Sequence, residues 1–448
     1  MSSITAADRS VTHARVLAIA LPMTLANMTT PLLGVVGTAV IGQLAQAHLL
    51  GAVAISGVVF DSIFWLFGFL RMGTVALTAQ ALGARDLKEE QATLARALLL
   101  AALLGLALIV LQVPLAVTAY QLMGASPEVT RAAEVYFYVR IWSAPFTLGN
   151  YVVLGWLVGL ARAGTALSLQ IAVNLINGVA TAALVLWLDM GVAGAALATV
   201  IAEASGLVAG LAIALALMGG RLAVAAADVL DRAKILRMLV VNRDIMIRTA
   251  ALIFAFGFFA AQGARAGDTV LAANAVLHNL VLVGAYFLDG FASAAEQLCG
   301  RSVGARDRRG FLAATRLVII WGFGFGIATT LLLLGIGPWL IGLMTRSPEV
   351  RAVAEQFLIY AALAPVIGVF AYAYDGIYIG ATWTRDMRNL MVAALAIYLA
   401  AWWLTLPLGN AGLWTAILMF LVARGILQFA RYAPLVRATF RETATAAP

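Results

Sequence analysis

Apolar residues dominate the chain in runs long enough to cross a lipid bilayer, and short polar segments separate these runs. A helix rises 1.5 Å per residue, so a transmembrane helix needs about 20 predominantly apolar residues. The first half of the chain is predicted to contain such spans at 15–41, 50–74, 93–119, 132–160, 164–188 and 191–218. The second half is predicted to contain them at 238–263, 269–296, 311–337, 352–381, 389–407 and 410–433. The pattern therefore predicts an all-α polytopic membrane protein with twelve transmembrane helices.

Two short strings occur once in each half of the chain. GARD stands at 83–86 and 304–307, and SPEV stands at 126–129 and 347–350. Both pairs keep one offset of 221 residues, from 83 to 304 and from 126 to 347. Chance similarity between apolar helices does not preserve a register through polar loop residues, so we infer an internal duplication. Each half has an even number of spans, which predicts two parallel six-helix lobes with substrate bound between them near the midplane.

The lobes are predicted at 1–218 and 235–448, because charged residues interrupt the apolar pattern in a linker at 219–234. Lys and Arg gather in both termini, in this linker and in alternate loops, whereas the opposite side has only Arg131, Arg265, Arg346 and Arg351. The positive-inside rule then puts both termini and the linker in the cytoplasm. We expect a multi-pass protein of a bacterial-type cytoplasmic (inner) membrane.

Composition narrows the function classes further. With 63% hydrophobic and 11% charged residues, the chain has too little polar surface to coat a soluble protein. The net charge of +8 comes from short loop clusters, so no nucleic-acid partner is expected. The single cysteine and the scattered histidines show no zinc spacing, so neither a metal site nor a cofactor is expected. A Walker loop and a large catalytic loop are both missing, which argues against an enzyme.

Acidic side chains inside the spans are the first candidates for function, because a charge at the bilayer centre costs about 2.5–3.5 kcal/mol on insertion scales. The within-span acids are Asp61 and Glu203 in the first half and Asp289, Glu296 and Asp375 in the second. A buried carboxyl can hold a proton at neutral pH because desolvation disfavours the anion, so proton binding can bias a two-state carrier. The alternative is that each acid only holds neighbouring helices together.

Other polar and aromatic side chains in the spans have two interpretations each. Arg248 is expected either to pair with a second-half acid or to extend toward the cytoplasmic surface. Several amides can bond to a buried carboxylate or a ligand, or can hold helices together; these are Asn150, Asn174, Asn177 and Asn274. Aromatic residues such as Tyr374 can line a cavity for a flat or cationic ligand, or can simply pack.

Several segments of the chain resemble the multidrug and toxic compound extrusion (MATE) family, and its DinF-like branch in particular. They are PLLGVVGTAVIGQL, LRMGTVALTAQALGARD, SAPFTLGNYVVLGWLVGLARA, GAALATVIAE, NRDIMIRT, LDGFASAAE and YDGIYIGAT. The resemblance covers nearly the whole chain. It implies a V-shaped, two-lobed secondary antiporter that expels amphipathic, often cationic compounds by alternating access in exchange for H⁺ or Na⁺.

The chain departs from the family pattern at the usual acids of the first lobe. Gly37 stands where the VDTAxIG motif has Asp, and Thr181 stands where an acid follows the paired amides of the fifth span. By contrast, Asp289 and Asp375 match the acids of the LDGFA and DGxxIG motifs.

Two coupling mechanisms follow from these departures. In the first, Asp61 replaces the missing first-lobe acid, with Glu203 and the amides of Asn150, Asn174 and Asn177 around it. In the second, coupling moves to the acids of the second lobe. A proton is expected as the coupling ion, with Na⁺ as the alternative.

The expected partners are amphipathic or cationic small molecules and membrane lipid, and the chain is expected to act as a monomer. Two other functions remain open on the sequence alone. One is a flippase for a lipid-linked precursor, and the other is a channel or membrane-embedded receptor without coupled transport.

Overall fold

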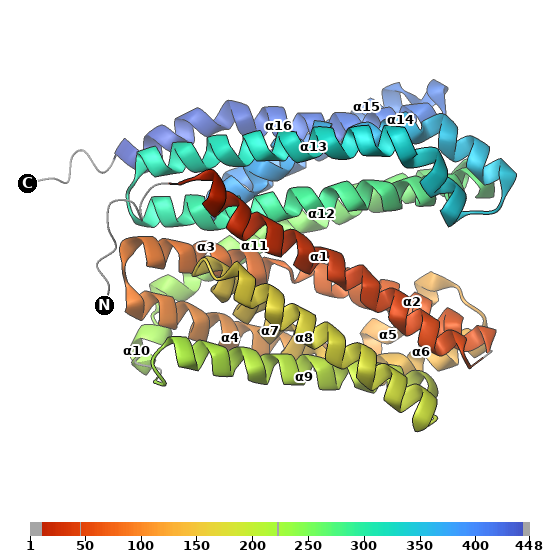
Figure 1. Ribbon diagram of the computed structural model, residues 1–448, viewed down its shortest axis with the longest axis horizontal. Helices are drawn as coiled ribbons and strands as arrows, with labels where there is room; N and C mark the ends of the chain where they lie inside the picture. Colours follow the sequence, from red (N-terminus) through yellow and green to blue (C-terminus); the bar gives the residue numbers. More distant parts are fainter. Residues whose placement is uncertain (1–10, 45, 222–223, 442–448) are drawn as a thin grey trace, which may run out of the picture. The chain divides into compact units, whose positions relative to one another are not determined.

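The computed structural model describes residues 11–44, 46–221 and 224–441, and every structural statement refers to these residues. They form α-helices joined by short turns, and the described ranges contain no strand (Figure 1). The helices of the first half are α1 (His13–Gly42), α2 (Ala47–Leu66), α3 (Phe69–Ala84), α4 (Leu87–Val110), α5 (Gln112–Met123), α6 (Pro127–Arg140), α7 (Ala144–Gly159), α8 (Ala163–Ala182), α9 (Gly191–Leu217) and α10 (Ala226–Val229). Those of the second half are α11 (Arg232–Arg265), α12 (Asp268–Gly304), α13 (Arg308–Met344), α14 (Pro348–Gly380), α15 (Thr384–Leu404) and α16 (Asn410–Arg441).

The helices confirm the predicted fold class. In the described part of the chain, 11 helical stretches are long and apolar enough to cross a membrane, and they coincide with the second to twelfth predicted spans. Helix α1 covers the first predicted span. The protein is therefore an all-α polytopic membrane protein.

The repeated GARD string ends one helix and begins the next in both halves. Arg85 and Arg306 adopt left-handed backbone conformations, with φ of 58° and 54°, which stops the preceding helix. The next residue then caps the following helix: Asp86 Oδ1 accepts from the Glu89 amide at 2.9 Å, and Asp307 does the same one repeat later. The string is preserved because it encodes this turn.

The SPEV strings have a similar structural role. The hydroxyls of Ser126 and Ser347 accept from backbone amides three residues later, each at 3.4 Å, and proline occupies the first turn of both helices. A side-chain cap followed by proline is a strong start signal for a helix. The constant offset thus has a physical basis in equivalent helix starts.

Glycine contacts repeat with the same offset. A Cβ on Gly155 of α7 would come within 2.5 Å of the carbonyl oxygen of Arg71 in α3. A Cβ on Gly376 of α14 would overlap the carbonyl oxygen of Ala292 in α12, so both partners shift by 221 (155 to 376 and 71 to 292). The contacts one turn later pair Gly159 with Val75 and Gly380 with Glu296. Close backbone packing at equivalent positions supports the inferred duplication.

Three predicted spans of the first half are interrupted, although their counterparts in the second half are continuous. The break between α4 and α5 lies at Leu111, and the break between α6 and α7 is a 3-10 turn, η2 (Ile141–Ser143). Pro114 and Pro145 lie just after these two breaks, and proline disfavours a helix because its ring clashes with the carbonyl four residues earlier. Proline alone does not break a helix here, since α13 and α14 stay continuous around Pro338 and Pro365. A further break at 67–68 separates α2 from α3. Helices α12, α13 and α14 have no corresponding break.

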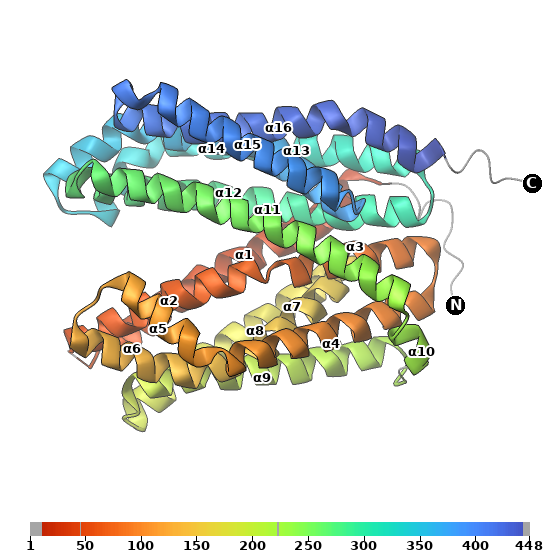
Figure 2. The same cartoon turned by 180° about the vertical axis from the view of Figure 1, so that it is seen from behind.

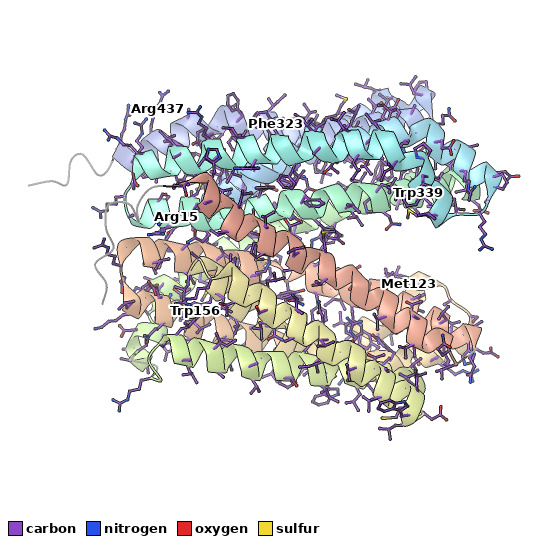
Figure 3. All side chains as sticks on the ribbon, viewed as in Figure 1. Arg15, Met123, Trp156, Phe323, Trp339 and Arg437 are labelled. Carbon is purple, nitrogen blue, oxygen red and sulfur yellow. The ribbon has the colours of Figure 1, made fainter. Side chains whose placement is uncertain are left out.

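The chain divides into two compact units. Unit 1 holds residues up to Thr24, Ala79–Arg85 and the chain from Val240 onward, and unit 2 holds Leu25–Thr78 and Asp86–Leu239. In unit 1, α12, α13, α14, α15 and α16 pack side by side around a core that also takes side chains from α11 (Figure 2). In unit 2, α4, α7, α8 and α9 pack together, and Trp156 of α7 is buried among them (Figure 3). The predicted lobes at 1–218 and 235–448 stay a prediction.

Candidate functional site

Charged residues of unit 2 gather where two of the interrupted helices meet. Asp61 lies on α2, shortly before the break at 67–68, and its side chain is exposed on this unit. Arg140 is the last residue of α6, immediately before the η2 turn. Its guanidinium lies over the ring of Phe60, 4.6 Å from the centroid, and donates to the Tyr136 hydroxyl at 3.0 Å. The positive charge of Arg140 acts on Asp61.

Glu203 of α9 belongs to the same charged group. The Asn150 amide of α7 donates to Glu203 Oε2 at 2.7 Å and to the Glu203 backbone oxygen at 2.9 Å. The Thr147 hydroxyl, one turn earlier on α7, bonds to the same side chain, and Arg140 acts on it electrostatically. The structure thus brings Glu203 together with Asn150, and it brings both predicted first-half acids into the field of one arginine.

The remaining polar residues of unit 2 form a separate chain of hydrogen bonds along α8. Asn174 donates to Thr29 of α1 at 2.8 Å, and Asn177 donates to Thr199 of α9 at 3.1 Å. Thr181 donates to Asn177 at 3.3 Å, just before a π-helical turn, η3 (Ala183–Trp187). These side chains hold α8 to its neighbours, and no hydrogen bond of the described residues joins them to Asp61 or Glu203.

Asp375 of α14 is enclosed by cationic side chains of unit 1. Its carboxylate forms ion pairs with Arg248 of α11 and Arg424 of α16, and it accepts from the Gln428 amide at 2.7 Å. All four side chains are buried, with exposures between 2% and 6%. The predicted pairing of Arg248 with a second-half acid is confirmed. The alternative, in which the Arg248 side chain extends toward the cytoplasmic surface, is wrong. The charge of Asp375 is thus compensated within the protein.

Asp289 and an aromatic cavity lie beside this ion-paired cluster. Asp289 of α12 is half-buried and acts electrostatically on Arg248 and on Tyr372 of α14. Tyr372 also lines a mainly apolar cavity of about 30 Å³ together with Phe259 and Trp414. Tyr372 therefore connects the acid on α12 with an aromatic-lined cavity of the same unit.

Two other predicted residues of unit 1, Asn274 and Tyr374, contact side chains of neighbouring helices. Asn274 exchanges hydrogen bonds with Asn410 at 2.8 and 3.0 Å and accepts from the Trp414 indole at 2.9 Å, so it ties α12 to the start of α16. Tyr374 packs in an aromatic cluster with its ring 5.5 Å from that of Tyr432. Glu296 is buried on α12. Among the described residues, no group of three or more His, Cys, Asp or Glu side chains is placed to hold a metal ion.

Sequence reasoning missed Arg140, Arg424 and Gln428, which complete the two charged clusters. Arg424 and Gln428 lie one turn apart in the last span, so they share one helix face. That spacing was a usable signal, since a cation inside a span needs a partner. Arg140 carried the same signal, because it lies inside the predicted span at 132–160.

The chain is similar to known proteins over most of its length. The MatE family model matches residues 22–184 and 245–404. The DNA damage-inducible protein F of Escherichia coli (strain K12) is 39% identical over 430 residues, which cover 95% of this chain and 92% of that protein. The probable multidrug resistance protein NorM of Caulobacter vibrioides is 28% identical over 430 residues, which cover 91% and 88% of the two chains.

Solved structures share the fold at lower identity. An outward-facing multidrug resistance MATE family transporter superposes with a TM-score of 0.86 at 20% identity, over 96% of this chain and 97% of that one. A MOP superfamily transporter from Pyrococcus furiosus superposes with a TM-score of 0.85 at 22% identity, over 95% and 96%. The family resemblance seen in the motifs is confirmed, and the chain belongs to the MatE family of membrane transporters, which are not enzymes.

Proposed function

We propose that this protein exports amphipathic or cationic small molecules in exchange for protons, and that Asp61 and Glu203 of unit 2 carry the coupling proton. The export part of the proposal draws on relatives whose names describe multidrug resistance. The coupling part rests on the geometry of this chain alone. We also propose that it works as a monomer in the cytoplasmic membrane with both termini in the cytoplasm.

The observation that carries the coupling proposal is the coincidence of the charged group with broken helices. Asp61 lies within about two helical turns of the α2–α3 break, and Arg140 directly precedes the α6–α7 break. Irregular backbone at membrane depth is tolerated only where it is buried in protein or lines a water-filled cavity. Transporters commonly bind substrates and ions at such discontinuous helices. The second-half counterparts of these helices are continuous.

The charge balance of unit 1 favours the same assignment. A coupling acid must exchange a proton with water during the cycle, and the charge it gains or loses must be tolerated. Neutralising Asp375 would leave Arg248 and Arg424 in the protein interior without their shared counter-ion. Neutralising Asp61 removes charge from a side chain that is already exposed on its unit.

The test uses purified protein in liposomes with an imposed pH gradient and ethidium as the transported probe. We expect gradient-driven ethidium transport by the wild type, loss of transport in Asp61→Asn, and retained gradient dependence in any Asp375→Asn protein that folds. Unchanged transport in Asp61→Asn would overturn the assignment.

Two further arms separate the competing functions. A Na⁺ gradient at equal pH on both sides should drive no transport, and ethidium accumulation under it would make Na⁺ the coupling ion. Labelled phospholipid should not be redistributed between the leaflets, and gradient-insensitive scrambling would support a flippase. The same liposomes without protein give the baseline for both arms.

A further inference from the structure

Among the described residues, helix α3 is one of three helices that pass from one compact unit to the other; the other two are α1 and α11. Residues up to Thr78 belong to unit 2, and Ala79–Arg85 belong to unit 1. Thr78 packs against Gly159 of α7, where an added Cβ would come within 2.7 Å of the Thr78 Cβ. Gln80 instead donates to the carbonyl oxygen of Gly380 in α14 at 2.9 Å. Neighbouring residues of one helix are thus anchored in different units.

The two anchoring glycines are equivalent positions of the duplication, since 159 and 380 differ by the constant offset of 221. Helix α3 therefore contacts the same point of each repeat in succession. Only the peptide units between Thr78 and Gln80 separate the two anchors. A change in the direction of α3 that keeps both anchors must take place within this segment.

Beyond Gln80, the last turn of α3 crosses the end of α12 by direct backbone contact. A Cβ on Gly83 would overlap the carbonyl oxygen of Arg301, and a Cβ on Gly304 would overlap that of Gln80. The contact is reciprocal, because 80 and 83 become 301 and 304 under the same offset. Backbones packed this closely cannot slide past each other without collision. The crossing therefore fixes the end of α3 to unit 1.

In the described part of the chain, the unpartnered hydroxyl of Thr78 is available for a hydrogen bond that accompanies a helix bend. The Thr78 side chain is fully buried, and its Oγ1 has no hydrogen-bond partner among the described residues. A threonine hydroxyl can bond to the carbonyl oxygen one turn earlier, and such bonding often accompanies a helix bend. The counterpart of α3 in the second repeat is part of α12, and α12 lies wholly within unit 1. The second repeat therefore has no equivalent of the Thr78–Gln80 segment that joins two units.

We propose that Thr78–Gln80 is a hinge of the transport cycle, and that the Gly83–Gly304 crossing stays closed while the hinge bends. The test of this hinge rests on the proposed function, because pH and ethidium are used to change the conformation. The liposome assay shows separately whether that function fails, so the two failures are distinguishable.

The test measures two distances by double electron–electron resonance in nanodiscs, with Cys299 replaced by Ser. Spin labels at 85 and 306 report on the crossing, where Arg85 and Arg306 are both exposed. Labels at 123 and 339 report on the two units, where Met123 and Trp339 are exposed (Figure 3). Between pH 8 and pH 6, with and without ethidium, we expect the 123–339 distribution to shift and the 85–306 distribution to stay unchanged. A shift at 85–306 as large as that at 123–339 would overturn the proposal.

A matched pair of substitutions tests the hinge itself. Ala76 and Ala79 are both fully buried on α3, one turn apart, and only Ala79 lies within the segment. Glycine loosens a helix at either site by about 1 kcal/mol. Ala79→Gly should alter the populations in the 123–339 distribution, and Ala76→Gly should leave them as in the parent protein. Equal effects of the two changes would contradict a hinge at Thr78–Gln80.

Discussion

Replacing Asp375 with Asn removes the shared counter-ion of two buried arginines while keeping the side-chain shape. Arg248 and Arg424 would then lie in the interior with Asp289 as the acid acting on Arg248. Breaking a buried ion pair costs about 3–5 kcal/mol, well above the roughly 1 kcal/mol of an ordinary hydrogen bond. For a unit of this size each kcal/mol lowers Tm by about 2–4 °C, so Tm should fall by about 6–20 °C.

The assay is thermal unfolding of purified protein in detergent, followed by tryptophan fluorescence. Asp386→Asn is the matched control, because Asp386 pairs with Arg431 at 2.9 Å and both side chains are partly exposed. That change should leave Tm within error of the wild type. Adding Arg248→Gln to Asp375→Asn removes one cation and restores the charge balance, so the double variant should be more stable than Asp375→Asn. A wild-type Tm in Asp375→Asn, or simple additivity in the double variant, would refute the reasoning.

Three further predictions follow from single contacts. Gly155→Ala should destabilise the protein by about 1–3 kcal/mol, because the added methyl group would overpack against α3. Gly324→Ala is the control and should not destabilise it, because the space around its Cβ is open. Chemical denaturation measures the stability of both variants. Asn150→Leu removes the hydrogen bond to Glu203, which is worth about 1.5–3 kcal/mol. Proton-driven ethidium transport should therefore fall while expression stays unchanged. Full transport by this variant would exclude a role for the amide. Asp307→Ala removes the cap of α13 and should cost about 1 kcal/mol by denaturation, with no loss indicating that the cap is replaced by water.

The helical spans were predictable because a bilayer demands uninterrupted apolar length, and each span has to satisfy its own backbone hydrogen bonds. The duplication was also predictable, since GARD and SPEV encode helix stops and caps that both halves need. The breaks in the first half were not predicted from the apolar pattern, although Pro114 stands four residues after the end of α4 and Pro145 five residues after the end of α6. Hydrophobicity averaged over a span hides this local backbone effect.

The partners of Asp375 were only partly predictable, because they come from three helices distant in sequence. Arg248 was recognised as a possible partner from its position inside a span, whereas Arg424 of α16, which also lies inside a predicted span, was overlooked. The same holds for Arg140, whose effect on Asp61 and Glu203 depends on how α2, α6 and α9 pack. Tertiary contacts of this kind are set by helix packing, and sequence periodicity identifies faces of helices without naming their partners.

The central claim is that the coupling proton binds in unit 2 at Asp61 and Glu203. The most direct measurement is the proton released when ethidium binds to purified protein in weakly buffered detergent, followed with a pH-sensitive dye. The wild type should release protons on binding, Asp61→Asn should release fewer, and Gly37→Asp added to Asp61→Asn should recover release, because a side chain at 37 has open space. Release from Asp61→Asn equal to that from the wild type would contradict the claim.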